Sequence, residues 1–132
     1  MIVVDTNVIA YLYLPGDHTA DAEALCRSDP EWVAPLLWRS ELRNVLATQV
    51  RARRLELDAA QSIQAEAEQL LHGREFAVDS AEVLRLAAES DCSAYDCEFV
   101  VLAEYLDVPL VSADRRLVQR FPGRALPLGG RG

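Results

Sequence analysis

The sequence predicts an α/β protein, in which a central parallel sheet lies between two layers of helices to form a three-layer α/β/α sandwich. Short runs of β-forming apolar residues alternate along the chain with longer segments of helical periodicity, a pattern typical of parallel strands joined by helices. Apolar residues make up 51% of the 132 residues, enough to cover a sheet that is buried on both faces. This length predicts one domain, which we expect over residues 1–128, and the glycine-rich residues 129–132 are expected to form a flexible tail.

Each expected strand is short and ends at a turn or a polar residue. Ile2–Val4 should form the first strand, because three β-forming residues run directly into the polar sequence Asp5-Thr6-Asn7. The remaining strands are expected at Trp32–Ala34, Phe76–Val78, Leu110–Ser112 and Ala125–Leu128. Helical segments separate all of these strands, which is why we expect them to be parallel.

The expected helices lie between these strands and begin at polar residues that can cap them. Asp58 and Asp79 are predicted N-caps, because each is followed three residues later by Gln or Glu, the spacing of a capping box. Ser93 stands at the same spacing before Asp96. The expected helices cover residues 6–14, 18–27, 36–54, 58–72, 80–89, 93–106 and 115–120.

The charge composition excludes some functions and leaves others open. The chain carries 21 acidic and 13 basic residues, for a formal net charge of −8 and a pI of about 4.7. Such a surface does not attract nucleic acid or anionic membrane as a whole, although a local basic face or a bridging cation still can. Every basic residue is arginine, so a reaction that needs a lysine ammonium group is excluded.

Cysteine content and hydropathy point to the cytoplasm. Cys26, Cys92 and Cys97 are odd in number, form no CxxC motif and have only His18 and His72 as further ligands, which disfavours a zinc site or a disulfide framework. No apolar stretch is long enough to span a bilayer, and the N-terminal residues show no signal-peptide pattern. We therefore expect a cytoplasmic protein without a membrane partner.

Two aspartates follow predicted strands. Asp5 follows the first strand and Asp114 follows the strand at 110–112, so both are expected at the carboxyl edge of the sheet. Ligands bind at this edge in open α/β folds. Each aspartate also precedes a predicted helix, so each has an alternative role as an N-cap.

Two further acids lie on the apolar faces of predicted helices. At about 100° per residue, Glu41 shares its face with Val45, and Asp96 shares its face with Val100. The alternatives are a glutamate that reaches solvent from the edge of its face, and an aspartate that completes a capping box with Ser93.

Convergence of these four acids on one pocket would need a compensating cation, because burying several carboxylates together is unfavourable. Since the chain has no lysine, arginine or a metal ion must supply the charge. Ligand sets made only of oxygen select hard cations such as Mg²⁺ or Mn²⁺. Such a site suits metal-assisted attack of water on a phosphodiester, because the metal lowers the pKa of its bound water and neutralises charge on the phosphoryl oxygens.

Three segments carry a family resemblance: VVDTNVIAYL at the start, SELRNVL in the long helix and SAYDCEFVVLAEYLDVPLVSADRRL near the end. In this order they resemble the PIN domain, and more narrowly the VapC-type toxin ribonucleases of toxin–antitoxin pairs. The resemblance covers residues 1 to about 128 and is most specific over 93–117. It implies an α/β/α fold and a cluster of catalytic acids that binds Mg²⁺ or Mn²⁺. By matching position, these acids are Asp5, Glu41, Asp96 and Asp114.

The resemblance also implies roles for neighbouring polar residues. Thr6 and Ser112 fall where the family often has small hydroxyl residues, and Asn7 follows the same opening pattern, so these three are expected to support the acids from beside the pocket. Arg115 and Arg116 stand where some members have a further acid. Because they adjoin the expected metal site, they are candidates for contacts with RNA phosphates.

The implied reaction is endonucleolytic hydrolysis of RNA by metal-activated water, which leaves a 5′-phosphate and a 3′-hydroxyl. No residue is expected to act as a covalent nucleophile. The resemblance further implies a homodimer that is held inactive by a small VapB-type antitoxin, whose tail covers the acidic pocket.

Other functions remain open at this point. A receiver-type phosphoacceptor domain needs a lysine that the chain lacks, and a phosphatase of the haloacid-dehalogenase type needs an aspartate where Asn7 stands. A PIN scaffold that binds RNA or protein without cutting is a third alternative, and the intact set of acids argues against it. A PIN nuclease with a housekeeping role is the fourth, and a neighbouring antitoxin-like reading frame would distinguish a toxin from it.

Overall fold

A five-stranded sheet forms the centre of the molecule, in a computed structural model that describes residues 1–129. Residues 130–132 of the expected tail lie outside the described residues. Every pair of neighbouring strands is parallel, as predicted. The strand order is β3-β2-β1-β4-β5. The strands are β1 (Ile2–Val4), β2 (Trp32–Pro35), β3 (Glu75–Phe76), β4 (Leu110–Ser112) and β5 (Ala125–Pro127).

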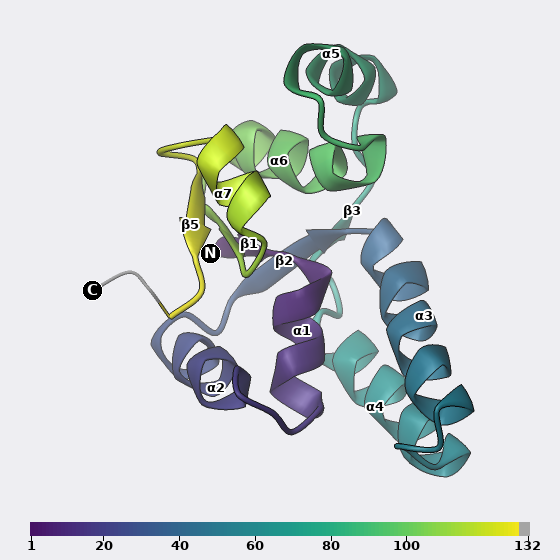
Figure 1. The fold of residues 1–132 in the computed structure, drawn as a ribbon. Coiled ribbons are helices and arrows are strands. Elements are labelled where there is room, and N and C mark those ends of the chain that lie inside the picture. Colours follow the sequence, from purple (N-terminus) through teal and green to yellow (C-terminus); the bar gives the residue numbers. More distant parts are fainter. Residues whose placement is uncertain (130–132) are drawn as a thin grey trace.

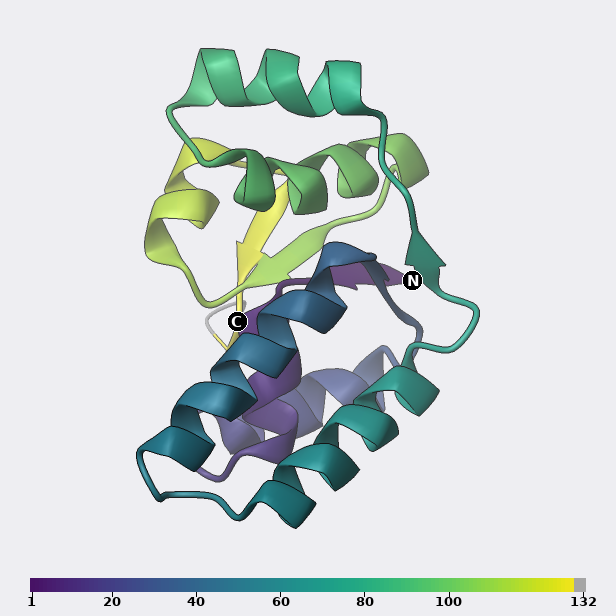
Figure 2. The ribbon, with the colours of Figure 1, turned by 90° about the vertical axis from the view of Figure 1, so that its right-hand side faces the viewer.

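Helices cover both faces of this sheet and complete the predicted α/β/α sandwich. Those on one face are α1 (Thr6–Tyr13), α2 (Thr19–Ser28), α3 (Leu37–Arg51) and α4 (Leu57–Leu70) (Figure 1). Those on the other face are α5 (Ser80–Ser90), α6 (Ala94–Leu106) and α7 (Arg115–Arg120) (Figure 2). Right-handed crossovers explain the division, because the chain adds β2 and β3 on one side of β1, and β4 and β5 on the other.

The core sits on both faces of the central strands. All three residues of β1 are buried, as expected for a strand covered by helices on both sides. Trp32 of β2 and Trp38 of α3 are both fully buried. The indole nitrogen of Trp38 donates a hydrogen bond to the carboxylate of Glu75 at 2.7 Å, and Arg39 forms an ion pair with the same carboxylate. This polar network ties α3 to the edge strand β3.

Most predicted element boundaries lie within two residues of those in the structure, and two of the differences have reasons in backbone geometry. The long helix ends at Arg51 rather than at residue 54, because Arg53 adopts a left-handed conformation with φ of 61°. The strand expected at 76–78 is instead Glu75–Phe76. Its partner β2 ends at Pro35, and the next residue, Leu36, donates its N–H to Phe76 but already has helical backbone as the N-cap of α3, so residues 77 and 78 have no strand to pair with.

The predicted helix caps were right at Asp79 and Ser93 and wrong at Asp58. Asp79 accepts a hydrogen bond from the N–H of Glu82 at 3.1 Å. Glu56 occupies the N-cap position of α4, and Asp58 lies in the first turn, where a negative charge interacts favourably with the helix dipole. None of the helices within residues 1–129 is long and apolar enough to cross a membrane.

The direction of strand addition reverses between β1 and β4. In open parallel sheets such a switch point leaves a crevice outside the carboxyl ends of the two strands, and ligands bind there. Asp5 directly follows β1, and Asp114 follows β4 after one intervening residue, Ala113. The fold therefore carries both residues to its preferred ligand-binding position.

Candidate functional site

A pocket at the carboxyl ends of β1 and β4 brings together the four acids that the sequence singles out. Asp5 follows β1 and Asp114 immediately precedes α7, while Glu41 projects from α3 and Asp96 from α6. All four line a single pocket of about 370 Å³. The rest of the pocket wall consists of two residues at the start of α1, Thr6 and Asn7, together with Leu37, Ser40, Asn44 and Val45 of α3 and Tyr95 of α6.

Asp5 directs its carboxylate toward the pocket rather than toward the helix that follows it. It occupies the N-cap position of α1, but its side chain makes no hydrogen bond to the first turn. Its backbone N–H donates to the carbonyl of Val111, which joins it to β4. The Oδ2 atom instead accepts a hydrogen bond from the hydroxyl of Ser112 at 2.7 Å. The alternative role as a side-chain N-cap is therefore wrong for Asp5.

Ser112 connects the two strand ends. Its side chain is fully buried, and while its hydroxyl donates to Asp5, its oxygen accepts from the N–H of Asp114 at 3.0 Å. One hydroxyl group therefore holds the first and fourth acids in a fixed relation, although they are more than a hundred residues apart in the chain.

Asp114 has two roles at once. Its Oδ1 atom accepts hydrogen bonds from the N–H groups of Arg116 at 2.9 Å and Leu117 at 3.4 Å, so it caps α7 as the alternative interpretation predicts. The residue also lines the acidic pocket. Since both cap bonds use Oδ1, the cap does not occupy Oδ2.

Glu41 and Asp96 reach the pocket from helices on opposite faces of the sheet. The Oε1 atom of Glu41 accepts a hydrogen bond from the hydroxyl of Thr6 at 2.7 Å, and Thr6 itself is buried. Val45, one turn further along α3, lines the same pocket, as the helical spacing predicts. Asp96 lies in the first turn of α6, where its N–H donates to the Ser93 hydroxyl at 3.0 Å.

The environment disfavours negative charge on three of the four acids. Burial raises the pKa of Asp5; the hydrogen bond from Ser112 partly offsets this, and the charges of Asp96 and Asp114 raise it further. Burial also raises the pKa of Glu41, and the charges of Asp5 and Asp96 add to the effect. For Asp96, burial and then the charge of Asp114 raise the pKa. A cation among these groups would relieve both causes.

The donor chemistry of the pocket fits a hard divalent cation, although the acids do not stand as a finished ligand set. Within residues 1–129, no three Asp, Glu, His or Cys groups are arranged so that they could hold a metal ion. Asp5 and Glu41 accept hydrogen bonds from hydroxyl groups, and Asp114 accepts them from backbone amides, so these carboxylates have partners within the protein. Repulsion between their negative charges also favours separation of the carboxylates from one another. All four acids nevertheless offer carboxylate oxygens to one pocket, and the lining residues of that pocket include no arginine. Carboxylates are the ligands that Mg²⁺ and Mn²⁺ prefer.

Sequence reasoning missed three residues of the pocket wall. Asn44 lies three residues after Glu41 on the same helix, so the spacing that identified Glu41 also identifies it. Ser40 precedes Glu41 and carries no pattern of its own. Tyr95, with 63% of its surface exposed, stands beside Asp96 at the rim, where an aromatic ring is available for stacking.

The two candidate arginines have different surroundings. Arg116 lies close enough to Asp96 for its positive charge to lower the pKa of that carboxyl, against the larger effects of burial and Asp114. Arg115 is exposed and lines a second cavity, whose lining also includes Ser112, the residue that donates to Asp5. Arg116 therefore acts on an acid of the pocket, whereas Arg115 belongs to the second cavity.

Comparison with known proteins identifies the family. The PIN domain model matches residues 2–122. Ribonuclease VapC3 of Pyrobaculum aerophilum is 31% identical over 131 residues, which cover 96% of this chain and 98% of the relative. The crystal structure of PAE2754 from Pyrobaculum aerophilum shares the fold with a TM-score of 0.78 and 23% identity, over 96% of this chain and 90% of that one. A toxin–antitoxin complex from Klebsiella pneumoniae contains a chain with a TM-score of 0.67 and 13% identity, over 96% of both chains. The chain belongs to the PIN domain family.

Proposed function

We propose that the chain is a metal-dependent endoribonuclease and that it is the toxin of a type II toxin–antitoxin pair. The observation that carries this proposal is the convergence of four carboxylates, from four separate segments of the chain, on one pocket at the switch point of the sheet. Membership of the PIN domain family and 31% identity with a ribonuclease support RNA as the substrate.

The four acids of the pocket would hold Mg²⁺ or Mn²⁺. When bound there, the ion lowers the pKa of a water molecule and neutralises the charge that builds up on the phosphoryl oxygens. The raised pKa values of Asp5, Glu41 and Asp96 support this assignment, because a site that disfavours uncompensated negative charge gains most from a cation.

Two hydroxyl groups orient the acids in this proposal. Ser112 donates to one oxygen of Asp5 and Thr6 donates to one oxygen of Glu41, so the second oxygen of each carboxylate is left for a cation. The buried positions of both hydroxyl residues restrict the carboxylates to few rotamers. Ser93 instead fixes the backbone of Asp96, because its hydroxyl oxygen accepts the N–H of Asp96 in the first turn of α6.

The acidic pocket also offers a means of inhibition. A pocket with four carboxylates attracts a basic side chain, and an arginine from a partner protein could occupy the position of the cation. One of the structural relatives is a toxin–antitoxin complex. We therefore propose that a VapB-type antitoxin covers the pocket. We also propose, from the family resemblance, that the active species is a homodimer.

Cleavage of end-labelled single-stranded RNA by the purified protein tests the proposal. We expect cutting in Mn²⁺ that stops in EDTA, leaves 5′-phosphate ends and is abolished in Asp96→Asn. Asp79→Asn is the matched control, because it makes the same chemical change at a helix cap that does not line the pocket. Cutting by Asp96→Asn at the wild-type rate, or cutting that persists in EDTA, would contradict the proposal. Failure of the folded wild-type protein to cut any of a panel of cellular RNAs would favour the scaffold interpretation.

A further inference from the structure

A second cavity lies where residues that follow β4 and β5 meet, and its lining differs in composition from that of the acidic pocket. Its volume is about 490 Å³. His18, Arg115 and Gln119 supply polar groups at its walls, and Val118, Pro127 and Leu128 supply apolar surface. None of its lining residues, all of which belong to the described part of the chain, is acidic, although the protein has 21 acidic residues. An anion can therefore approach this cavity more readily than the acidic pocket.

Ser112 connects the second cavity to the acids. It lines the second cavity, and its hydroxyl group contacts Asp5 and the backbone of Asp114 on the side of the acids. Arg115 follows Asp114 directly in the chain. The second cavity and the acids are therefore connected through adjacent residues of one short segment, Ser112 to Arg115.

The walls of the second cavity match the two parts of a nucleotide. The exposed guanidinium group of Arg115 can bind a phosphate through two parallel hydrogen bonds. The ring of His18 packs against the ring of Tyr11, with centroids 4.5 Å apart, which restrains the imidazole beside the cavity. The apolar surface suits the face of a base or a ribose, which needs no specific hydrogen bond.

We propose that this cavity binds the nucleotide next to the scissile phosphodiester, with Arg115 and His18 on its phosphate and its base on the apolar surface. This inference rests on the proposed function, because it requires RNA at the acidic pocket. It explains how a protein of net charge −8 holds a polyanion without an extended basic face. It also makes the cavity a determinant of which nucleotide flanks the cut.

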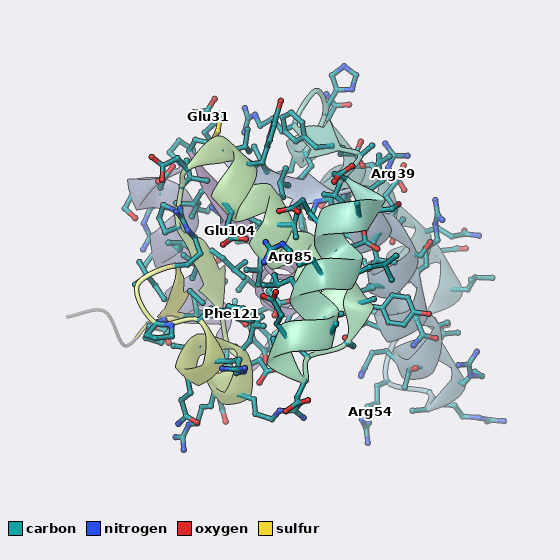
Figure 3. The ribbon with its side chains drawn as sticks, turned by 90° about the horizontal axis from the view of Figure 1, so that it is seen from above. Glu31, Arg39, Arg54, Arg85, Glu104 and Phe121 are labelled. Carbon is teal, nitrogen blue, oxygen red and sulfur yellow. The ribbon has the colours of Figure 1, made fainter. Side chains whose placement is uncertain are left out.

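Arg115→Gln and His18→Gln test the phosphate contact, and Arg54→Gln is the matched control. Arg54 follows α3 and is exposed, and Figure 3 shows it well separated from Phe121, the C-cap residue of α7. Each variant is checked for an unchanged unfolding temperature. Binding of fluorescein-labelled single-stranded RNA is then measured by anisotropy over a series of salt concentrations, with Ca²⁺ in place of Mn²⁺ to prevent cleavage.

We expect Arg115→Gln to weaken binding about tenfold and to reduce the slope of log Kd against log salt by about 0.7, the value for one lost phosphate contact on a single strand. In cleavage with Mn²⁺, KM should rise about tenfold while kcat changes little, because the lost contact acts on substrate and transition state alike. A substrate with an abasic site on one side of the cut should also show a raised KM, whereas an abasic site several nucleotides away should not.

The outcomes separate this inference from the proposed function. If the wild-type protein cuts RNA and Arg115→Gln behaves like Arg54→Gln, the nucleotide site is refuted while the nuclease proposal stands. If Arg115→Gln weakens binding of an antitoxin and leaves RNA binding unchanged, the cavity serves a protein partner and the inference is again refuted. If the wild-type protein neither binds nor cuts RNA, the proposed function itself fails, and the wild-type data alone show this.

Discussion

Replacing Asp5 by asparagine should stabilise the protein when no divalent cation is present. The carboxylate of Asp5 is largely withdrawn from water, and two neighbouring acids raise its pKa further. Asparagine has nearly the same shape and keeps an oxygen that can accept the hydrogen bond from Ser112. The substitution therefore removes an unfavourable charge and keeps the local geometry.

The expected gain follows from two opposing contributions. Each unit by which the fold raises the pKa of a carboxyl group above its ordinary value costs about 1.4 kcal/mol at neutral pH. Replacing the charged acceptor of the Ser112 hydroxyl by a neutral one returns about 0.5–1 kcal/mol of this. Single stabilising substitutions commonly add about 0.5–2 kcal/mol. We expect a gain of about 1 kcal/mol, which corresponds to about 3–5 °C in Tm for a domain of this size.

Urea unfolding followed by circular dichroism in EDTA measures this gain, and its pH dependence identifies the cause. Because the folded pKa of Asp5 lies above its ordinary value of 3.8, the folded state binds more protons than the unfolded state between these two values. Wild-type stability should therefore contain a contribution that is lost as pH rises through the folded pKa. The advantage of Asp5→Asn should accordingly be largest near pH 7 and should shrink as pH falls toward about 4.

Asp79→Asn controls for the chemical change itself. Asp79 caps α5 through a hydrogen bond to the N–H of Glu82, and asparagine is an equally good N-cap, so its stability should change by less than about 0.5 kcal/mol. If Asp5→Asn is less stable than the wild type near pH 7 in EDTA, or if its advantage does not depend on pH, the carboxylate of Asp5 has a structural role and the reasoning is refuted.

Three further predictions follow from named contacts. Asp114→Asn should keep the cap of α7 and lower RNA cleavage by about a hundredfold. Asp114→Ala also removes the cap and should cost about 1 kcal/mol of unfolding free energy. Equal stability of the two variants in urea would contradict the capping role. Ser112→Ala removes the hydrogen-bond donor to Asp5, so it should raise the pKa of the Asp5 carboxyl. The loss of unfolding free energy should be about 1–2 kcal/mol near pH 7 and smaller near pH 5. A loss that does not depend on pH would show that only packing is affected. Glu75→Ala leaves the buried indole N–H of Trp38 without its acceptor and should lower the free energy of unfolding by about 2–3 kcal/mol, measured by thermal unfolding. Because the hydrogen bond from Arg39 lowers the pKa of Glu75, wild-type stability should also fall as pH drops below about 4.5. Unchanged stability of Glu75→Ala would contradict the role of this network.

Local patterns in the sequence were sufficient to predict the fold class and to single out the four acids that line the pocket. Asp5 could be identified because a three-residue apolar strand ends directly before it. Glu41 could be identified because it shares a helical face with Val45, and both line the same pocket in the structure. In each case the informative residues lie within about one helical turn or one strand of one another, the range over which periodicity acts.

Features that depend on contacts between distant segments were not predictable. The hydrogen bond from Ser112 to Asp5 joins residues that are remote in sequence, and no periodicity refers to it. The second cavity, to which His18 and Arg115 come from opposite ends of the chain, belongs to the same class. The error at Asp58 has a different origin: Glu56 and Asp58 both precede the apolar pattern of α4, and the choice of cap depends on backbone conformation.

Binding of Mn²⁺ to the protein, measured by isothermal titration calorimetry, tests the central claim most directly. If the four acids of the pocket together hold a divalent cation, the wild-type protein and Asp79→Asn should bind Mn²⁺ equally. Asp5→Asn and Asp96→Asn should lose most of this binding while remaining folded, because each removes one charged oxygen ligand. Undiminished Mn²⁺ binding by both pocket variants would contradict the account.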